Sequence, residues 1–301
     1  MLQTQTKLNN NQISDLVPRF IEYAQFELGL SPQTITKYKE SLNWLQKDLD
    51  YIKTVELLEL DDITTLKKKM QMRGVGACRV NSIIFALRKF LIYCKEIRKI
   101  NTINPQEIKP MKVARRQVEF LTKEEIQQLL NSINTKDKRG LRMRALMELL
   151  LATGMRIGEA LSLDIADINW PNKEAMIVGK GNKQRTVFLT DRAVYWLQEY
   201  LAKRNDTNPA LFITFGRLTR LTRFDLSKQF KHYAQKAGLT KRLTPHILRH
   251  TMATLMLNNG ANLFDIKEML GHSSIETTAR HYLGTDKKTI KESHAKYLKF
   301  D

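Results

Sequence analysis

Hydrophobic residues recur every three or four positions along much of the first hundred residues, which is the period of amphipathic helices. In the segment 33–49, for example, Ile35, Tyr38 and Leu42 fall on one helical face. Ser31-Pro32 stands just before this segment and supplies a capping side chain and a first-turn proline. The pattern contains no strand signal. It predicts an all-helical module with helices at 13–27, 33–49, 63–72 and 77–96.

The second half of the chain has a mixed pattern. Thr122 to Glu125 form a capping box that opens a helix. Two short runs, 175–178 and 186–189, predict strands, and the turn 180–183 joins them as a hairpin. The fold class is therefore mainly α with a small β-hairpin or sheet in the second domain. The remaining apolar periodicity predicts helices at 126–133, 141–152, 157–163, 193–203, 226–237, 245–258, 263–270 and 275–282.

The two patterned halves are separated by a stretch of different character. Pro105 and Pro110 interrupt helical continuity there. We predict a basic linker at 105–119, between a helical domain at 1–104 and a second domain at 120–301. We also expect the basic residues of this linker to contact a polyanion; they are Lys109, Lys112, Arg115 and Arg116.

The charge of the chain indicates the kind of partner. There are 50 Lys and Arg against 31 Asp and Glu, a formal net charge of +19. The excess is shared, with 20 basic and 12 acidic residues in 1–116 and 30 and 19 in 117–301. Nucleic acid is the leading partner, because neutralised phosphates release counterions. A generally basic or ribosome-associated protein has the same charge, so charge alone does not decide.

Cysteine usage and the chain start indicate a cytoplasmic protein. Cys78 and Cys94 both lie in apolar helical patterns, which predicts buried free thiols and fits a reducing compartment. The first twelve residues have no apolar signal region. The most apolar stretch, 145–155, contains Glu148 and is too short to span a bilayer.

Two arginines are candidates for binding a phosphate. Arg156 lies between two predicted helices, and Arg249 lies on the helix that follows Thr244-Pro245. A guanidinium offers several donors in a rigid fork and keeps its charge, so two of them can hold phosphate oxygens in a transition state. A single arginine such as Arg156 is more often a surface or salt-bridged residue, and only its occurrence together with the other candidate residues favours a functional role.

The hairpin turn carries further candidates. Lys180 stands between Gly179 and Gly181, which allow the tip to approach DNA closely, and its ammonium could protonate a departing 5′ oxygen. A lysine at a hairpin tip is ordinarily just solvated. For Lys183 and Arg185 we predict contacts with backbone phosphates.

Histidines and a tyrosine complete the set. His246 and His250 have a zinc-ligand spacing, but Ile247 stands where a metalloprotease motif needs Glu, so we expect no metal. His246 shares a helical face with the arginine one turn later and can meet the same phosphate. His272 lies at a helix end. Tyr282 is the candidate nucleophile, although a phenol with pKa about 10 needs nearby cations or a base, and such a tyrosine is usually a core aromatic.

The ordered pattern resembles the tyrosine recombinase family, the Xer-type and phage-integrase-type site-specific recombinases. The resemblance covers about 130 residues and is specific, because five segments occur in the right order: 152–161 (ATGMRIGEAL), 179–185 (GKGNKQR), 244–250 (TPHILRH), 270–274 (LGHSS) and Tyr282. It implies that the catalytic residues are Arg156, Lys180, His246, Arg249, His272 and Tyr282, with Glu159 in support.

The resemblance also implies an architecture and a mechanism. A helical core-binding domain and a mixed α/β catalytic domain would form a two-domain clamp on duplex DNA with two inverted half-sites. Four protomers, identical or mixed with a related recombinase, would hold two sites. Strands would be cut to a 3′-phosphotyrosine, exchanged and resealed without metal, nucleotide or other cofactor. One departure is the spacing from His272 to Tyr282, ten residues where nine is expected.

Other functions share this chemistry or fold. A type IB topoisomerase or a telomere resolvase uses the same covalent link, and a DNA-binding regulator could keep the fold without cutting. The short chain and paired domains favour a recombinase. The sequence leaves open whether its role is Xer-like dimer resolution or integration and excision of a mobile element.

Overall fold

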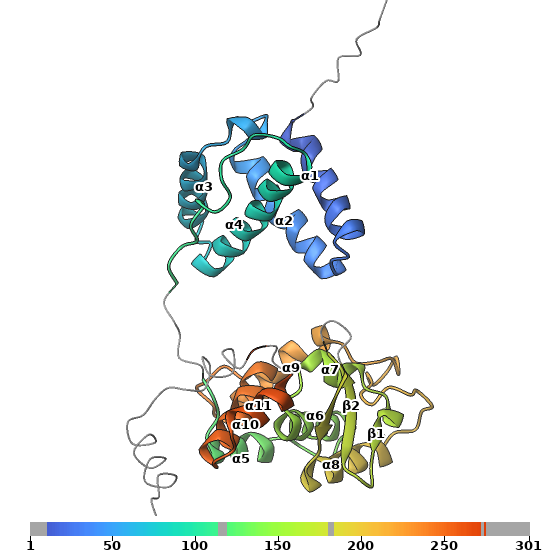
Figure 1. Ribbon diagram of the computed structural model, residues 1–301. Helices are drawn as coiled ribbons and strands as arrows, with labels where there is room; N and C mark the ends of the chain where they lie inside the picture. The colour runs from blue at the N-terminus through green and yellow to red at the C-terminus, as the bar shows by residue number, and fades with distance from the viewer. Residues whose placement is uncertain (1–10, 114–118, 180–183, 272–273, 275–301) are drawn as a thin grey trace, which may run out of the picture. The chain divides into compact units, whose positions relative to one another are not determined.

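The computed structural model describes residues 11–113, 119–179, 184–271 and 274. The chain divides into two compact units, Met1–Arg116 and Gln117–Asp301 (Figure 1). Each unit has its own hydrophobic core. Within the described residues, no helix is both long enough and apolar enough to cross a membrane.

Residues 11–113 of the N-terminal unit form a helical bundle that contains no β-strand, which confirms the prediction of a helical module. Its α-helices are α1 (Ile13–Glu22), α2 (Pro32–Asp48), α3 (Leu60–Met72) and α4 (Ala77–Ile92). Ser31 caps α2 as expected, because its hydroxyl accepts a hydrogen bond from the Thr34 amide. The aromatic ring of Phe20 lies at the centre of the unit and contacts the rings of Tyr38, Phe90 and Tyr93.

Two predicted helices of this unit end differently from the expectation. The segments 13–27 and 77–96 are not continuous α-helices, since α1 and α4 each pass into one π-helical turn, η1 (Tyr23–Glu27) and η3 (Tyr93–Ile97). Cys94 is buried, and burial followed by the charge of Glu56 raises the pKa of its thiol to about 12. Cys78 is exposed, so its predicted burial is wrong.

The first part of the expected linker packs on the N-terminal unit. Ile108 is buried in its core. The side-chain amide of Asn81 on α4 accepts a hydrogen bond from the Met111 amide (2.7 Å) and donates one to the Met111 carbonyl (2.9 Å). Lys67 on α3 donates to the Lys109 carbonyl (2.6 Å). The segment 105–111, expected to begin the linker, is therefore bound to this unit.

The C-terminal unit is built around one helix. α6 (Lys138–Thr153) is buried over most of its circumference and packs against α8 (Asp191–Ala202) and α10 (Pro245–Asn258). Figure 1 shows α6 in the middle of the unit. This position explains why 141–152 is nearly continuous in apolar residues rather than amphipathic.

A small sheet and shorter helices complete the unit. The strands are β1 (Ile168–Asn169), β2 (Glu174–Val178) and β3 (Gln184–Phe188), in the antiparallel order β1-β2-β3. The predicted hairpin strands are confirmed, with Met176 opposite Thr186. The two-residue β1 was not predicted, and the predicted helix 275–282 lies outside the described residues. The other helices are α5 (Lys123–Asn131), α7 (Ile157–Ser162), α9 (Arg223–Lys236) and α11 (Leu263–Leu270).

Replacing Asn81 with Ala is expected to release the segment 105–111 from α4. The Met111 amide and carbonyl lose both side-chain partners, and such a loss costs ~1–3 kcal/mol for each partly buried group. Limited trypsin digestion of the full chain should then cut after Lys112, the residue that follows Met111, faster than in wild type. Asn101→Ala, at an exposed position nearby, is the control; equal digestion rates in the two variants would contradict the assignment.

Candidate active site

The turn between α6 and α7 positions Arg156. Gly154 ends α6 in the left-handed conformation (φ 59°), where a residue with a Cβ is strained. Arg156 is the residue before α7, and its amide donates to the Glu159 carboxylate (2.7 Å). Its Nη1 donates to the same carboxylate (3.0 Å). The Arg156 side chain remains 37% exposed, so part of its guanidinium is open to solvent.

A second arginine lies on the other side of Glu159. Arg185 on β3 donates from Nη1 (3.0 Å) and Nη2 (2.8 Å) to the two carboxylate oxygens. For Arg185 we predict contacts with DNA phosphates; in the structure it forms this internal ion pair, and its side chain is 12% exposed. Burial alone raises the pKa of Glu159, but hydrogen bonds from Arg185 and Arg156 outweigh it, so that pKa lies below its ordinary value.

Arg249 is held by backbone carbonyls. Its Nη1 donates to the Gly154 carbonyl (2.7 Å), and its Nη2 donates to the Leu270 carbonyl (2.6 Å). The residue is buried, on the second turn of α10. Both acceptors lie at C-terminal ends of helices, where carbonyls lack helical partners. The guanidinium is thus held by the carbonyls of two residues, one of which precedes Arg156 by two positions in the sequence and the other precedes His272 by two.

His246 lies in the first turn of α10, which Thr244 caps and Pro245 opens. Partial burial lowers the pKa of its imidazole, and the charges of Arg249, Arg156 and Arg223 lower it further. Both effects favour the neutral form of the imidazole. The structure thus brings together three of the predicted site residues, namely Arg156, His246 and Arg249.

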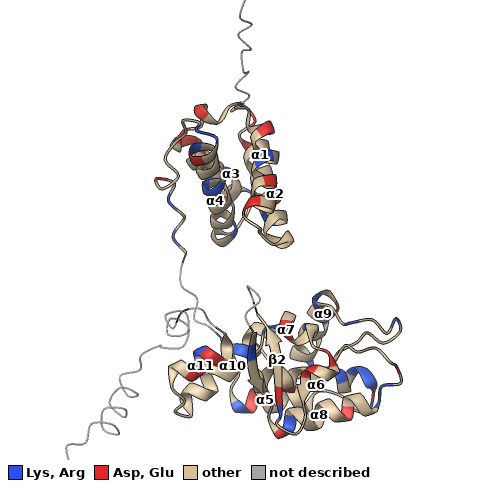
Figure 2. Ribbon diagram, turned by 45° about the vertical axis from the view of Figure 1, so that its right-hand side comes forward, with Lys and Arg blue, Asp and Glu red and all other residues tan. Residues whose placement is uncertain are grey.

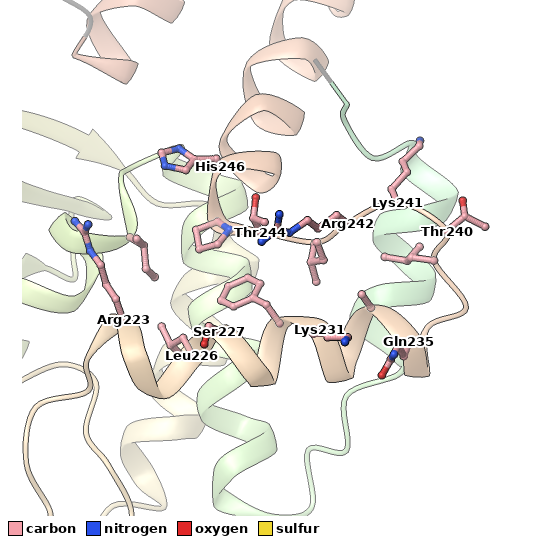
Figure 3. Close-up of a pocket in the computed structure, with 16 residues that line it drawn as sticks. Arg223, Leu226, Ser227, Lys231, Gln235, Thr240, Lys241, Arg242, Thr244 and His246 are labelled. Atoms are coloured by element: carbon pink, nitrogen blue, oxygen red, sulfur yellow. The ribbon is translucent and has the colours of Figure 1, made fainter. Parts of the chain in front are cut away.

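Arg223 is a site residue that the sequence analysis missed. It begins α9, and its guanidinium lies against Gly158, where an added Cβ would come within 2.1 Å of its Nη2. Figure 3 shows Arg223 and His246 on neighbouring elements of one groove. The dipeptide Thr222-Arg223 has the pattern of an ordinary solvent-facing helix start, so only the spatial proximity to α7 reveals the residue.

The groove runs between α9 and the segment 239–246 and has a volume of about 720 Å³ (Figure 3). Its apolar floor includes Leu226, Phe230 and Leu243. Lys231, Lys241 and Arg242 also line it, and Lys241 is paired with Glu125 (2.7 Å). Figure 2 marks Lys and Arg positions in blue along the ribbon of α9. An elongated anion could therefore lie beside His246.

Two other predicted site residues are described by the structure. Lys109 and Lys112 lie exposed on the N-terminal unit. The remaining predicted residues lie outside the described part of the chain: Lys180, Lys183, His272, Tyr282, Arg115 and Arg116.

Replacing Arg223 with Gln is expected to raise the pKa of His246, because one of the charges that disfavour the imidazolium is removed. An NMR titration of the imidazole in the full chain measures this pKa. Arg242→Gln is the matched control, because it removes a charge from the same groove that is not among those acting on His246. An unchanged pKa in Arg223→Gln, or an equal rise in both variants, would contradict the electrostatic assignment.

Comparison with known proteins gives consistent similarities. Residues 119–289 match the model of the phage integrase family. The chain is 34% identical over 291 residues to tyrosine recombinase XerD of Oceanobacillus iheyensis, covering 92% of this chain and 96% of that protein.

Two solved structures are also similar. One is the XerH site-specific recombinase bound to palindromic difH substrate, with 25% identity, a TM-score of 0.74, and 94% of this chain and 84% of that chain covered. The other is the Tn1549 transposon integrase in complex with a circular intermediate DNA, whose TM-score of 0.82 at 18% identity (95% and 99% covered) supports the fold. The chain belongs to the phage integrase family and is a tyrosine recombinase, an enzyme of site-specific DNA recombination.

Proposed function

We propose that Arg156, Arg249 and His246 bind the scissile phosphate of duplex DNA and that Tyr282 attacks it. One observation supports this proposal: the Glu159 carboxylate holds Arg156, carbonyls at two helix ends hold Arg249, and both arginines lie close enough to His246 to lower the pKa of its imidazole. The two arginines Arg156 and Arg185 together with the one carboxylate of Glu159 have a net positive charge, and the carbonyls of Gly154 and Leu270 that accept from Arg249 are neutral. The site therefore keeps a positive charge, which can stabilise the negative charge that develops on a pentacoordinate phosphate.

In the proposed step, the Tyr282 hydroxyl gives its proton to the imidazole of His246, the Tyr282 oxygen forms a bond to phosphorus, and the bond to the 5′ oxygen breaks. Lys180 gives its proton to the departing 5′ oxygen, and the product is a 3′-phosphotyrosine with a free 5′ hydroxyl. The neutral imidazole of His246 can accept or donate a hydrogen bond at the phosphate, and His272 would bond another oxygen. The reverse reaction reseals the strand, so no external energy source is consumed.

We further propose that the enzyme works on two inverted half-sites and assembles as a tetramer on two DNA sites. The similarity to proteins named XerD over nearly the whole chain favours Xer-like resolution of DNA dimers over integration or excision of an element. In this proposal the N-terminal unit (Met1–Arg116), which includes the basic segment, grips the opposite face of the duplex. Lys109, Lys112, Arg115 and Arg116 then bind backbone phosphates, and Lys183 does so from the hairpin.

A topoisomerase would share the covalent step but not the exchange. Supercoiled plasmid carrying one target site and plasmid carrying two sites distinguish the two activities. Exchange between two sites supports the recombinase, whereas relaxation independent of a site favours the topoisomerase. We also place the activity in the cytoplasm, because the chromosomal and plasmid DNA of a bacterium lies there.

Tyr282→Phe is expected to keep DNA binding and to lose all covalent protein–DNA adducts, because only the attacking oxygen is removed. Adducts are counted on denaturing gels with a nicked suicide substrate, and binding is measured by gel shift. Tyr297→Phe is the matched control and should still form adducts. Adducts that persist in Tyr282→Phe and vanish in Tyr297→Phe would make Tyr297 the nucleophile.

Lys180→Ala is expected to slow cleavage of ordinary DNA by ~10²–10⁴-fold, because the 5′ alkoxide leaves poorly without a proton. In a substrate with sulfur in place of the bridging 5′ oxygen, the 5′ sulfur leaves as a stable thiolate and needs no general acid. That substrate should restore most of the rate in Lys180→Ala but not in Arg156→Ala. Rescue of Lys183→Ala instead would assign the acid to Lys183.

A further inference from the structure

Arg185 connects three parts of the C-terminal unit that are distant in the sequence. It lies on β3, and its Nη1 and Nη2 bind both carboxylate oxygens of Glu159 on α7. Its Nε donates to the Met269 carbonyl at the end of α11 (3.2 Å). Because the side chain is 12% exposed and three of its nitrogens have protein partners, the guanidinium is built into the structure rather than offered to solvent.

The end of α11 is shaped to receive this guanidinium. Gly271 ends α11 with φ 62°, and a Cβ added there would lie 2.9 Å from Nη1 and 3.0 Å from Cζ of Arg185. Only glycine therefore permits both the backbone turn and the close contact. The neighbouring Leu270 carbonyl accepts from Arg249. Two guanidinium groups thus fix the helix end that directly precedes His272.

The Glu159 carboxylate is saturated when Arg185 is present. It accepts the Arg156 amide and Nη1 on one side and the two Arg185 nitrogens on the other. Without Arg185, the buried charge of Glu159 would be left to Arg156 alone. The Arg156 guanidinium would then turn to bind both carboxylate oxygens, because a bidentate pair is the stronger geometry. Its charge would be neutralised and its donors withdrawn from the phosphate.

We infer that Arg185 is a positioning residue for DNA cleavage: it occupies the Glu159 carboxylate so that Arg156 keeps its charge and outer N–H groups for the phosphate, and it holds the end of α11. The inference rests on the proposed role of Arg156. In this inference Arg185 makes no contact with DNA, whereas its position on the hairpin strand β3 had led us to predict one.

A matched pair elsewhere in the same unit provides the control. Glu148 is also buried and also accepts from two arginines, Arg144 (2.9 Å) and Arg192 (2.8 Å). Arg192→Met leaves that carboxylate with one arginine, as Arg185→Met leaves Glu159. Neither Glu148 nor Arg192 is among the residues assigned to the phosphate site. The Arg192 side chain is 54% exposed and that of Arg185 is 12% exposed, so thermal unfolding of both variants separates a loss of stability from a loss of positioning.

The experiment measures covalent-complex formation in single turnover at saturating suicide substrate, together with DNA affinity and thermal unfolding. Arg185→Met should slow cleavage by ~10²-fold with nearly unchanged DNA affinity, and Arg192→Met should not. Arg185→Lys should remain impaired, because one ammonium cannot bind both carboxylate oxygens and the Met269 carbonyl together. Adding Glu159→Gln to Arg185→Met should recover part of the lost rate, because the unbalanced carboxylate is gone.

The pH dependence provides a second readout. Arg185 is the first of the groups that lower the pKa of Glu159 against burial. In Arg185→Met that pKa rises, so lowering the pH protonates Glu159 and releases Arg156. The cleavage deficit of Arg185→Met relative to wild type should therefore shrink as the pH falls. A purely structural defect would not shrink in this way.

The outcomes separate this inference from the proposed function. Slow cleavage by Arg156→Lys with normal cleavage by Arg185→Met overturns the role of Arg185 alone. Normal cleavage by Arg156→Lys overturns both. Parallel losses of affinity and cleavage in Arg185→Met would make Arg185 a DNA contact, and a double variant no faster than Arg185→Met would overturn the charge argument.

Discussion

The C-terminal unit depends on one constraint: several positive groups must stand close together while keeping their charge. Like charges at such distances repel, and the repulsion is stronger where water is excluded. The structure meets the constraint in two ways. Arg156 and Arg185 share the single carboxylate of Glu159, and Arg249 is held by carbonyls at the ends of α6 and α11. These carbonyls are at the negative ends of helix dipoles, so they attract a cation without cancelling its charge.

Hydrophobic packing sets where these charges lie. α6 is buried on most sides, and its last turn leads through Gly154 to Arg156. At Gly154 an added Cβ would come within 2.0 Å of the Met252 Cε on α10. The glycine thus allows α10 to pack closely and offers its carbonyl to Arg249 on that same helix. Core packing and the geometry of the site are therefore one problem, and a change in either helix alters both.

The sequence predicted the local structure well and the long-range pairs poorly. Caps such as Ser31 and Thr122 depend on neighbouring residues, so their signals are visible in the sequence and the structure contains both. Arg185 stands next to a polar turn and has the pattern of a solvent-facing strand end, yet its partner Glu159 is 26 residues away. The same reason explains why the sequence did not predict that the segment 105–111 packs on α4, where two hydrogen bonds between Asn81 and Met111 hold it. No local pattern records such contacts.

Residue type alone does not distinguish an arginine that binds phosphate from one that supports it; the identity of its acceptors does. Arg185 faces a carboxylate with both Nη atoms, so its charge is balanced within the protein. Arg249 faces neutral carbonyls with its Nη atoms, so its positive field extends to the neighbouring imidazole and lowers the pKa of His246. Arg156 combines the two conditions, with one Nη atom on the carboxylate and part of the side chain exposed. A bound phosphate would supply the negative charge that balances Arg249 and Arg156. The charge of Arg185 is already balanced by Glu159, so it is not available to the phosphate.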